Sequence, residues 1–147
     1  MNILLINHYA GNPELGMEFR PYYMAKEWVK QGHEVLILGA TYSHLRKKQP
    51  LKAGNEVIDG IDYYWVKTNT YRGNGIGRIR SMFSFVWKLY WNYKKYIGDF
   101  KPDVVIASST YPLDIYPARR IARRFKAQLI YEVHDLWPLS PMEIAGY

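Results

Sequence analysis

The order of short apolar runs and helical patterns constrains the fold more than any other feature of this chain. Residues 3–6 and 35–38 are apolar runs without polar alternation, as in strands that helices cover on both faces. A helical pattern starting near Arg20 separates them, and Pro21 suits its first turn. A strand, a helix and a strand within about forty residues most simply form a right-handed βαβ unit.

The rest of the chain continues this order. Two segments, 56–58 and 61–67, predict a hairpin, because the Asp59-Gly60 between them suits a tight turn. Further on, the sequence predicts a long helix, a strand, a helix and a strand, at residues 78–97, 103–107, 113–126 and 128–133. We therefore expect an α/β fold with a Rossmann-like, doubly wound, mostly parallel sheet.

The composition narrows the classes of partner. The chain has a formal net charge of +7, with 14 Tyr and 5 Trp among its 147 residues. Cations interleaved with aromatic rings suit nucleic acid, anionic lipid or phosphorylated substrates. Nucleic acid is disfavoured, because the aromatic residues follow helical core spacing and no helix-turn-helix, zinc-finger or RRM pattern is found. Without cysteine, a basic leader or a long apolar span, the sequence favours a cytoplasmic protein.

The helix predicted at residues 78–97 carries more apolar surface than packing on one sheet requires. At about 100° per residue, one stripe is assigned to the core: Ile79, Met82, Phe83, Val86, Leu89, Tyr90, Tyr93 and Ile97. Trp87 and Trp91 fall outside it, beside Arg80, Lys94 and Lys95. Tryptophan flanked by cations is typical of helices at membrane interfaces, so these five residues are predicted to face anionic lipid. The alternative is that another segment, or a missing domain, covers the rings.

A second basic cluster, in the helix predicted at residues 113–126, consists of Arg119, Arg120, Arg123 and Arg124. A solvated face is the commonest explanation of such a run. Because the same chain carries the helix with the tryptophans, one shared anionic surface is the alternative. That alternative implies a protein peripheral to the cytoplasmic face of the inner membrane.

Polar residues follow three predicted strands, at 8–16, 108–111 and 134–138, where ligands of open parallel sheets bind. His134 and Asp135 come directly after the last strand, where a catalytic or sugar-binding side chain would lie. Alternatively, His134 bonds a loop carbonyl and Asp135 caps a turn, and residues 108–111 form a plain turn before a helix. The sequence has no Asp-x-Asp and no His pair four residues apart, so we predict neither a metal nor a bound cofactor.

The end of the chain has the signals of a helix start. Ser140 suits an N-cap, Pro141 the first helical position and Glu143 the first turn. Only residues 144–147 follow. We therefore expect residues 1–147 to be the amino-terminal domain of a longer protein, truncated before its natural boundary.

Five motifs support a resemblance to a known family. They are NILLINHY at residues 2–9, GMEFRPYY at 16–23, GHEV at 32–35, PDVV at 102–105 and YEVHDLWP at 131–138. Together they resemble the amino-terminal domain of family-four GT-B glycosyltransferases, of the type that makes bacterial envelope polysaccharide, such as O-antigen, lipopolysaccharide or capsule. The resemblance covers essentially the whole chain, and the joint occurrence of the third and last motifs makes it specific.

The resemblance implies retaining transfer of a sugar from a nucleotide-sugar to a lipid-linked or polysaccharide acceptor, in a cleft between two Rossmann-like domains. The amino-terminal domain would mainly bind the acceptor, and the absent carboxyl-terminal domain would bind the donor nucleotide, so this domain alone would be inactive. By position, His134 would be catalytic, and Gly16 and Asp135 would approach the donor phosphates or sugar. The residues implied on the acceptor side are Tyr9, Glu18, Arg20, Ser109 and Tyr111.

Two other functions remain open at this point. A nucleotide-sugar 2-epimerase of the GT-B type has a similar amino-terminal half, and a product assay separates epimerisation from transfer. A glycan- or membrane-binding module without catalysis is the alternative of a different class. In a transferase, breaking the glycosyl phosphate bond builds negative charge on the departing diphosphate, so N–H donors and cations are needed near the phosphates.

Overall fold

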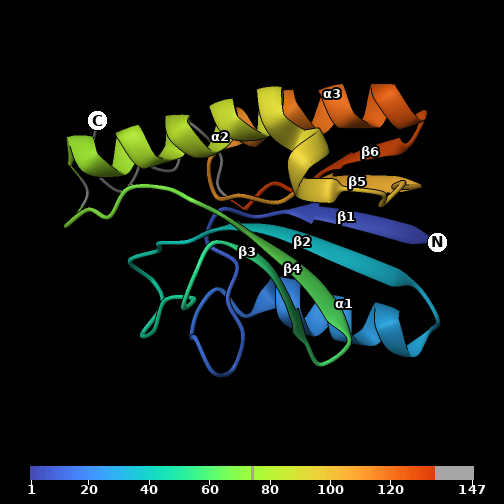
Figure 1. Cartoon of the computed structure of the whole chain (residues 1–147), viewed down its shortest axis with the longest axis horizontal. Coiled ribbons are helices and arrows are strands. Elements are labelled where there is room, and N and C mark those ends of the chain that lie inside the picture. Colours follow the sequence, from blue (N-terminus) through green and yellow to red (C-terminus); the bar gives the residue numbers. More distant parts are fainter. Residues whose placement is uncertain (74, 135–147) are drawn as a thin grey trace.

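The computed structural model describes residues 1–73 and 75–134, and its strands form one sheet in the order β3-β4-β2-β1-β5-β6 (Figure 1). Neighbouring strands are parallel except β3, which pairs antiparallel with β4. The strands are β1 (Asn2–Ile6), β2 (Glu34–Ala40), β3 (Gly54–Ile58), β4 (Ile61–Val66), β5 (Val104–Ala107) and β6 (Gln128–Tyr131). The predicted α/β fold with a Rossmann-like, mostly parallel sheet is confirmed.

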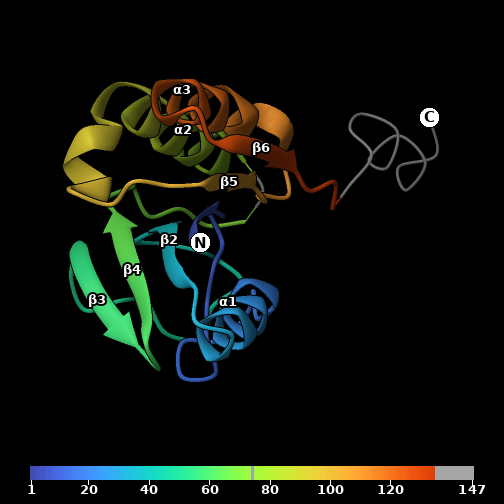
Figure 2. The same ribbon diagram turned by 90° about the vertical axis from the view of Figure 1, so that its right-hand side faces the viewer.

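Helices cover the sheet on both faces (Figure 2). The helical elements are α1 (Arg20–Lys30), α2 (Ile76–Ile97), the short 3-10 helix η1 (Pro112–Asp114) and α3 (Ile115–Phe125). On one face, Phe85 and Leu89 of α2 and Ile121 of α3 pack against the sheet. On the other face, Tyr22 and Ala25 of α1 do so. The crossover through α1 therefore covers one face of the sheet, and the crossovers through α2 and α3 cover the other.

The hairpin predicted around Asp59 and Gly60 is confirmed. It joins β3 to β4, and these two residues have φ values of 52° and 78°. Two successive positive φ values give the tight turn whose twist matches the flanking strands, and glycine adopts them without strain. Because β3 lies at the edge of the sheet, its antiparallel pairing leaves the parallel order of the other strands intact.

The core stripe assigned to α2 was partly wrong. The buried residues of this helix are Ser81, Phe85, Leu89, Tyr93, Tyr96 and Ile97. Ile79 and Phe83 are 51% and 58% exposed, and Met82, Val86 and Tyr90 are only half-buried. The helix has apolar residues on two opposite sides, so periodicity alone could not identify the side that meets the sheet, and a kink at Asn92 shifts the stripe further. No helix in the described residues is both long enough and apolar enough to cross a bilayer.

Candidate functional site at the carboxyl edge of the sheet

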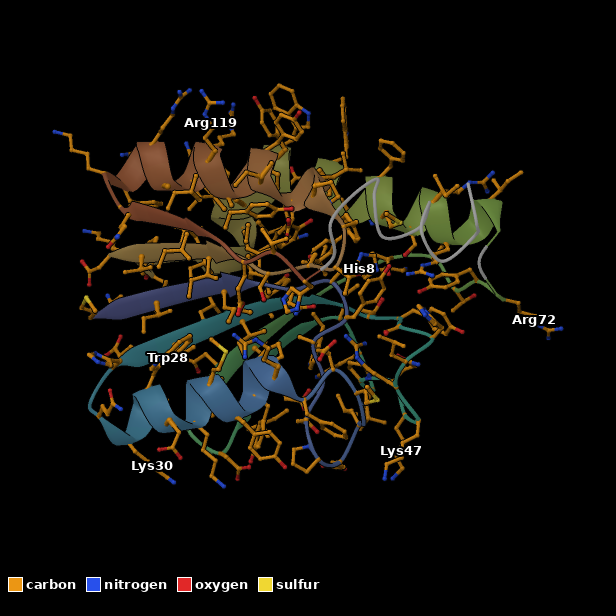
Figure 3. The ribbon with its side chains drawn as sticks, turned by 180° about the vertical axis from the view of Figure 1, so that it is seen from behind. His8, Trp28, Lys30, Lys47, Arg72 and Arg119 are labelled. Carbon is orange, nitrogen blue, oxygen red and sulfur yellow. The ribbon has the colours of Figure 1, made fainter. Side chains whose placement is uncertain are left out.

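The carboxyl ends of β1, β5 and β6 lie side by side. Ile6 pairs with Ala107, and Ala107 pairs with Tyr131, so the residues that follow these strands emerge next to one another. Figure 3 shows His8, which follows β1, at this edge of the sheet. The parallel topology thus brings together three loops that are distant in the sequence, as expected for the ligand site of such a sheet.

Four side chains at this edge form a connected group, which we call the edge network: Arg20, Ser108, Glu132 and His134. The hydroxyl of Ser108 donates to Glu132 Oε2 at 2.7 Å and lies 3.1 Å from His134 Nε2. Glu132 Oε2 is also 3.8 Å from His134 Nε2. From the first turn of α1, Arg20 donates to Glu132 Oε1 through Nε at 2.9 Å and through a second guanidinium nitrogen. The edge network therefore connects α1 to the ends of β5 and β6.

The neighbours of Glu132 keep this carboxylate charged. Burial alone would raise its pKa, but hydrogen bonds from Ser108 and Arg20, with the charges of Arg20 and His134, lower the pKa of Glu132 overall. The side chains of Glu132 and His134 are 20% and 19% exposed. His134 is thus held by an anion while part of its ring remains accessible from solvent.

A fully buried layer supports the edge network from beneath. The Nδ1 of His8 lies 2.7 Å from the hydroxyl of Tyr111, and its Nε2 lies 3.4 Å from the hydroxyl of Ser81 on α2. The backbone N–H of His8 donates to Ser109 Oγ at 3.0 Å. Burial, and then the charge of Arg46 among nearby cations, holds the pKa of His8 well below 6.5. The ring is therefore neutral at neutral pH and serves as a fixed hydrogen-bonding partner.

A second group of side chains lies beside the first turn of α2. Arg78 donates to the hydroxyl of Tyr9 at 3.4 Å, and its guanidinium carbon is 5.6 Å from the ring centroid of Tyr9. The ring of His44 meets Tyr9 edge to face at 5.6 Å, and its Nδ1 lies 2.8 Å from the hydroxyl of Tyr71. Burial, followed by the charge of Arg78, lowers the pKa of His44. A guanidinium next to aromatic hydroxyls is a suitable environment for a phosphate or a sugar.

The loop between β1 and α1 is folded back on itself by backbone hydrogen bonds. Gly11 donates to the carbonyl of Glu18 at 2.9 Å, and Glu18 donates to the carbonyl of Tyr9 at 3.0 Å. The N–H of Gly16 donates to the carbonyl of Asn12 at 2.8 Å, and Gly16 has a φ of 105°, which favours glycine. A Cβ on Gly11 would lie 1.9 Å from the carbonyl oxygen of Gly16. Both glycines are therefore needed for this loop geometry.

Two of the predicted site residues, Arg20 and His134, are brought together through Glu132. Gly16 lies in the loop that leads into α1, so its segment also reaches the edge network. Its N–H is used within the loop, however, so Gly16 does not present a free amide to a phosphate in this structure. Asp135 lies outside the described residues.

The residues predicted on the acceptor side divide by burial. Tyr9, Ser109 and Tyr111 are at most 2% exposed, so in this structure they support the surface from beneath. Arg20 is exposed and Glu18 is half-buried, so both can be reached by a ligand. The roles of all five in binding an acceptor remain predictions.

Sequence reasoning missed Ser108, Glu132 and His8 as individual site residues. A signal was available, because all three come within two residues of the end of a strand, and ligand-binding side chains gather there in parallel sheets. His8 comes one residue later than Ser108 and Glu132 do after their strands. For Arg46 no local signal existed: it is buried and donates to the carbonyl of Ala10 at 2.8 Å, across 36 residues of sequence.

The chemistry available at this edge is that of the imidazoles of His134 and His44, the carboxylate of Glu132, two guanidinium groups and several hydroxyls. Within residues 1–73 and 75–134, no three His, Asp or Glu side chains gather closely enough to hold a metal ion. Imidazole and guanidinium groups can bind and stabilise a phosphate or a developing negative charge.

A mostly parallel sheet with polar loops at its carboxyl edge is typical of ligand-binding α/β domains of the Rossmann-like kind, and this domain belongs to that class. A family model described as a glycosyl transferase 4-like domain matches residues 16–146. The chain therefore belongs to the glycosyl transferase 4-like family, and its fold is consistent with one half of a GT-B enzyme. No match was found among curated proteins. The family supports glycosyl transfer as the general activity, with a nucleotide-sugar donor and an acceptor.

Proposed function

We propose that this chain is the amino-terminal, acceptor-side domain of a retaining GT-B glycosyltransferase. It transfers a sugar from a nucleotide-sugar to a lipid-linked or polysaccharide acceptor in cell-envelope glycan synthesis. A carboxyl-terminal domain supplies most of the donor nucleotide site, so residues 1–147 alone are inactive. The match to the glycosyl transferase 4-like family supports the reaction class, and the motifs that resemble envelope enzymes are the basis for the acceptor.

The edge network is the observation that carries the proposal. Its imidazole is fixed through Nε2 by Ser108 and Glu132, and we place the transferred sugar or its phosphate against the rest of the His134 ring. As the glycosyl phosphate bond breaks, negative charge grows on the departing diphosphate, and a preorganised N–H donor stabilises it. Arg20 balances the charge of Glu132, so that the carboxylate holds the ring without repelling the phosphates.

The test is a transfer assay of the full-length gene product with a panel of nucleotide-sugars, followed by analysis of the product. His134→Ala is expected to lower kcat about a hundredfold or more, the usual cost of removing one such donor. His33→Ala is the matched control, because His33 lies at the amino end of β2 and contacts the chain's amino terminus. Wild-type transfer by His134→Ala, or an epimerised nucleotide-sugar as the product, would contradict the proposal.

A further inference from the structure

Helix α2 has an exposed apolar stripe opposite the side that it buries. Phe85 and Leu89 face the core, whereas Phe83, Trp87 and Trp91 are 58%, 67% and 54% exposed. Single exposed apolar residues are ordinary, but a continuous row of aromatic rings along one helix marks a surface that binds something. Figure 2 shows α2 and α3 together on one face of the sheet, and the exposed stripe lies opposite the α2 residues that pack on that sheet.

The arginines of α3 join this stripe. The guanidinium carbon of Arg120 lies 4.6 Å from the ring centroid of Tyr90 and 5.1 Å from that of Trp91. These distances are in the range of cation–π attraction, which holds Arg120 against the rings. We call the combined surface the outer helical face; it consists of Arg80, Phe83, Trp87, Trp91, Tyr116 and Arg120 with the neighbouring Arg119 and Arg123.

Two adjoining hollows give the outer helical face a polar end and an apolar end. The first, of about 340 Å³, is lined by Tyr90, Tyr116, Arg119, Arg120 and Arg123. The second, of about 310 Å³, shares Tyr90 and Tyr116 and continues to Phe83, Val86, Trp87 and Trp91. A group with an anionic head and an apolar body would match both hollows at once.

The charge of this face has a single sign. Helix α2 carries five Lys or Arg residues and α3 carries four, and neither helix contains an Asp or a Glu. The ion pairs found in the described part of the chain lie elsewhere, on α1 and in the edge network. Two of these nine cations are used elsewhere, since Arg78 contacts Tyr9 and Lys88 donates to the carbonyl of Lys67. The other seven give the two helices a positive charge without a carboxylate to balance it, which suits an anionic partner.

We infer that the outer helical face docks on an anionic lipid bilayer, with the arginine hollow at the lipid phosphates and the tryptophan rings in the interfacial region. Tryptophan prefers that region, and each Lys or Arg near an anionic surface adds to the attraction. The predicted membrane-facing residues agree with this geometry, since Arg80, Trp87, Trp91, Lys94 and Lys95 are all exposed.

The packing of the rings argues against single-stranded nucleic acid as the partner. Trp87 and Trp91 meet at 62° with centroids 5.9 Å apart, and Tyr90 meets Trp91 edge to face at 79°. The guanidinium group of Arg120 lies over the ring of Trp91. Base stacking needs rings with open faces, whereas Tyr90 and Trp91 are partly covered by each other and by the guanidinium of Arg120.

The test is co-sedimentation of the purified protein with phosphatidylcholine vesicles that contain or lack phosphatidylglycerol. We expect binding to the anionic vesicles, and a loss on the order of a hundredfold in Arg119→Gln/Arg120→Gln/Arg123→Gln, since each cation contributes about tenfold or less. Trp87→Ala/Trp91→Ala is expected to lose ~tenfold or more through its smaller apolar contact. The control Lys30→Gln/Lys47→Gln/Lys48→Gln removes the same charge from the opposite side, where Figure 3 shows Lys30 and Lys47, and should bind normally.

The inference would be overturned by equal binding to neutral and anionic vesicles, by no binding to either, or by an equal loss in the lysine control. Tighter binding to a single-stranded oligonucleotide than to anionic vesicles at equal phosphate concentration would also overturn it, and would identify nucleic acid instead. Thermal unfolding of every variant confirms that it is folded. Because the assay contains neither donor nor acceptor, its outcome is independent of the transferase proposal.

Discussion

The edge network and the outer helical face both contain arginine side chains, but they hold these cations differently. In the edge network, Arg20 is paired with Glu132, and the carboxylate fixes His134. On the outer helical face, Arg120 lies over aromatic rings, and no carboxylate occurs on either helix. The first arrangement fixes the geometry of single atoms, whereas the second presents net charge over a broad surface.

This difference separates two requirements of one enzyme. Chemistry at a glycosyl phosphate needs donors in defined positions, which a compensated and hydrogen-bonded network supplies. Attachment to a fluid surface needs uncompensated charge and interfacial rings, without a defined geometry. We therefore expect that substitutions can disable either region without affecting the other.

The largest expected effect is this separation of functions. His134→Ala should lower kcat about a hundredfold or more while vesicle binding is unchanged. The variant with Arg119, Arg120 and Arg123 replaced by Gln should lose vesicle binding on the order of a hundredfold while turnover of a detergent-solubilised acceptor is unchanged. Both quantities are measured on both variants, and a parallel loss of the two activities in either variant would contradict the comparison.

The tightly folded loop between β1 and α1 can be tested by a substitution at Gly11. Gly11→Ala would place a Cβ 1.9 Å from a backbone oxygen, and we expect it to lower the free energy of unfolding by roughly 1–3 kcal/mol, the usual cost of overpacking. Gly75→Ala is the control, since a Cβ there meets nothing within 4 Å. Denaturant unfolding of both variants measures the difference, and equal stabilities would show that the loop adjusts freely.

The buried His8 should make stability depend on pH. Because burial holds the pKa of His8 well below 6.5, the unfolded chain takes up a proton that the folded chain does not. The free energy of unfolding should therefore fall as the pH drops below 6.5, by about 1.4 kcal/mol per pH unit from this residue. Asp114 acts in the opposite direction, since burial raises its pKa to about 6.

The contribution of His8 is isolated by comparing the wild type with His8→Gln across this pH range. Asp114 is present in both proteins and cancels in the difference. The difference in the free energy of unfolding should shrink as the pH falls below 6.5, and a constant difference would contradict the neutral, buried state of His8.

The smallest expected effect is on the link between α1 and β6. The pKa of Glu132 is lowered in the folded state, so its stabilisation is present above about 4.5 and is lost as the pH falls through the lower folded value. Glu132→Gln should cost ~1 kcal/mol at neutral pH, because Arg20 is half exposed. Well below pH 4.5, the wild type and the variant should have the same free energy of unfolding.

The sheet could be predicted because unbroken apolar runs and turn residues are local signals. His134 was predicted at the ligand edge because the last strand was expected to run to residue 133; β6 ends earlier, at Tyr131, and is exposed, but its carboxyl end still leads His134 to Ser108 at that edge. The partners of His134 could not be predicted, because Arg20 and Glu132 are 112 residues apart and meet only through the tertiary fold. The core side of α2 was misassigned because both of its sides are apolar, and only contact with the sheet distinguishes them.

The central claim is that Glu132 acts through His134, so that the edge network works as one unit. A double-mutant cycle on kcat with His134→Ala and Glu132→Gln, in the full-length gene product, tests it most directly. The account predicts that Glu132→Gln slows the wild-type enzyme but has little further effect once His134 is replaced. Two losses that multiply in the double variant would contradict it.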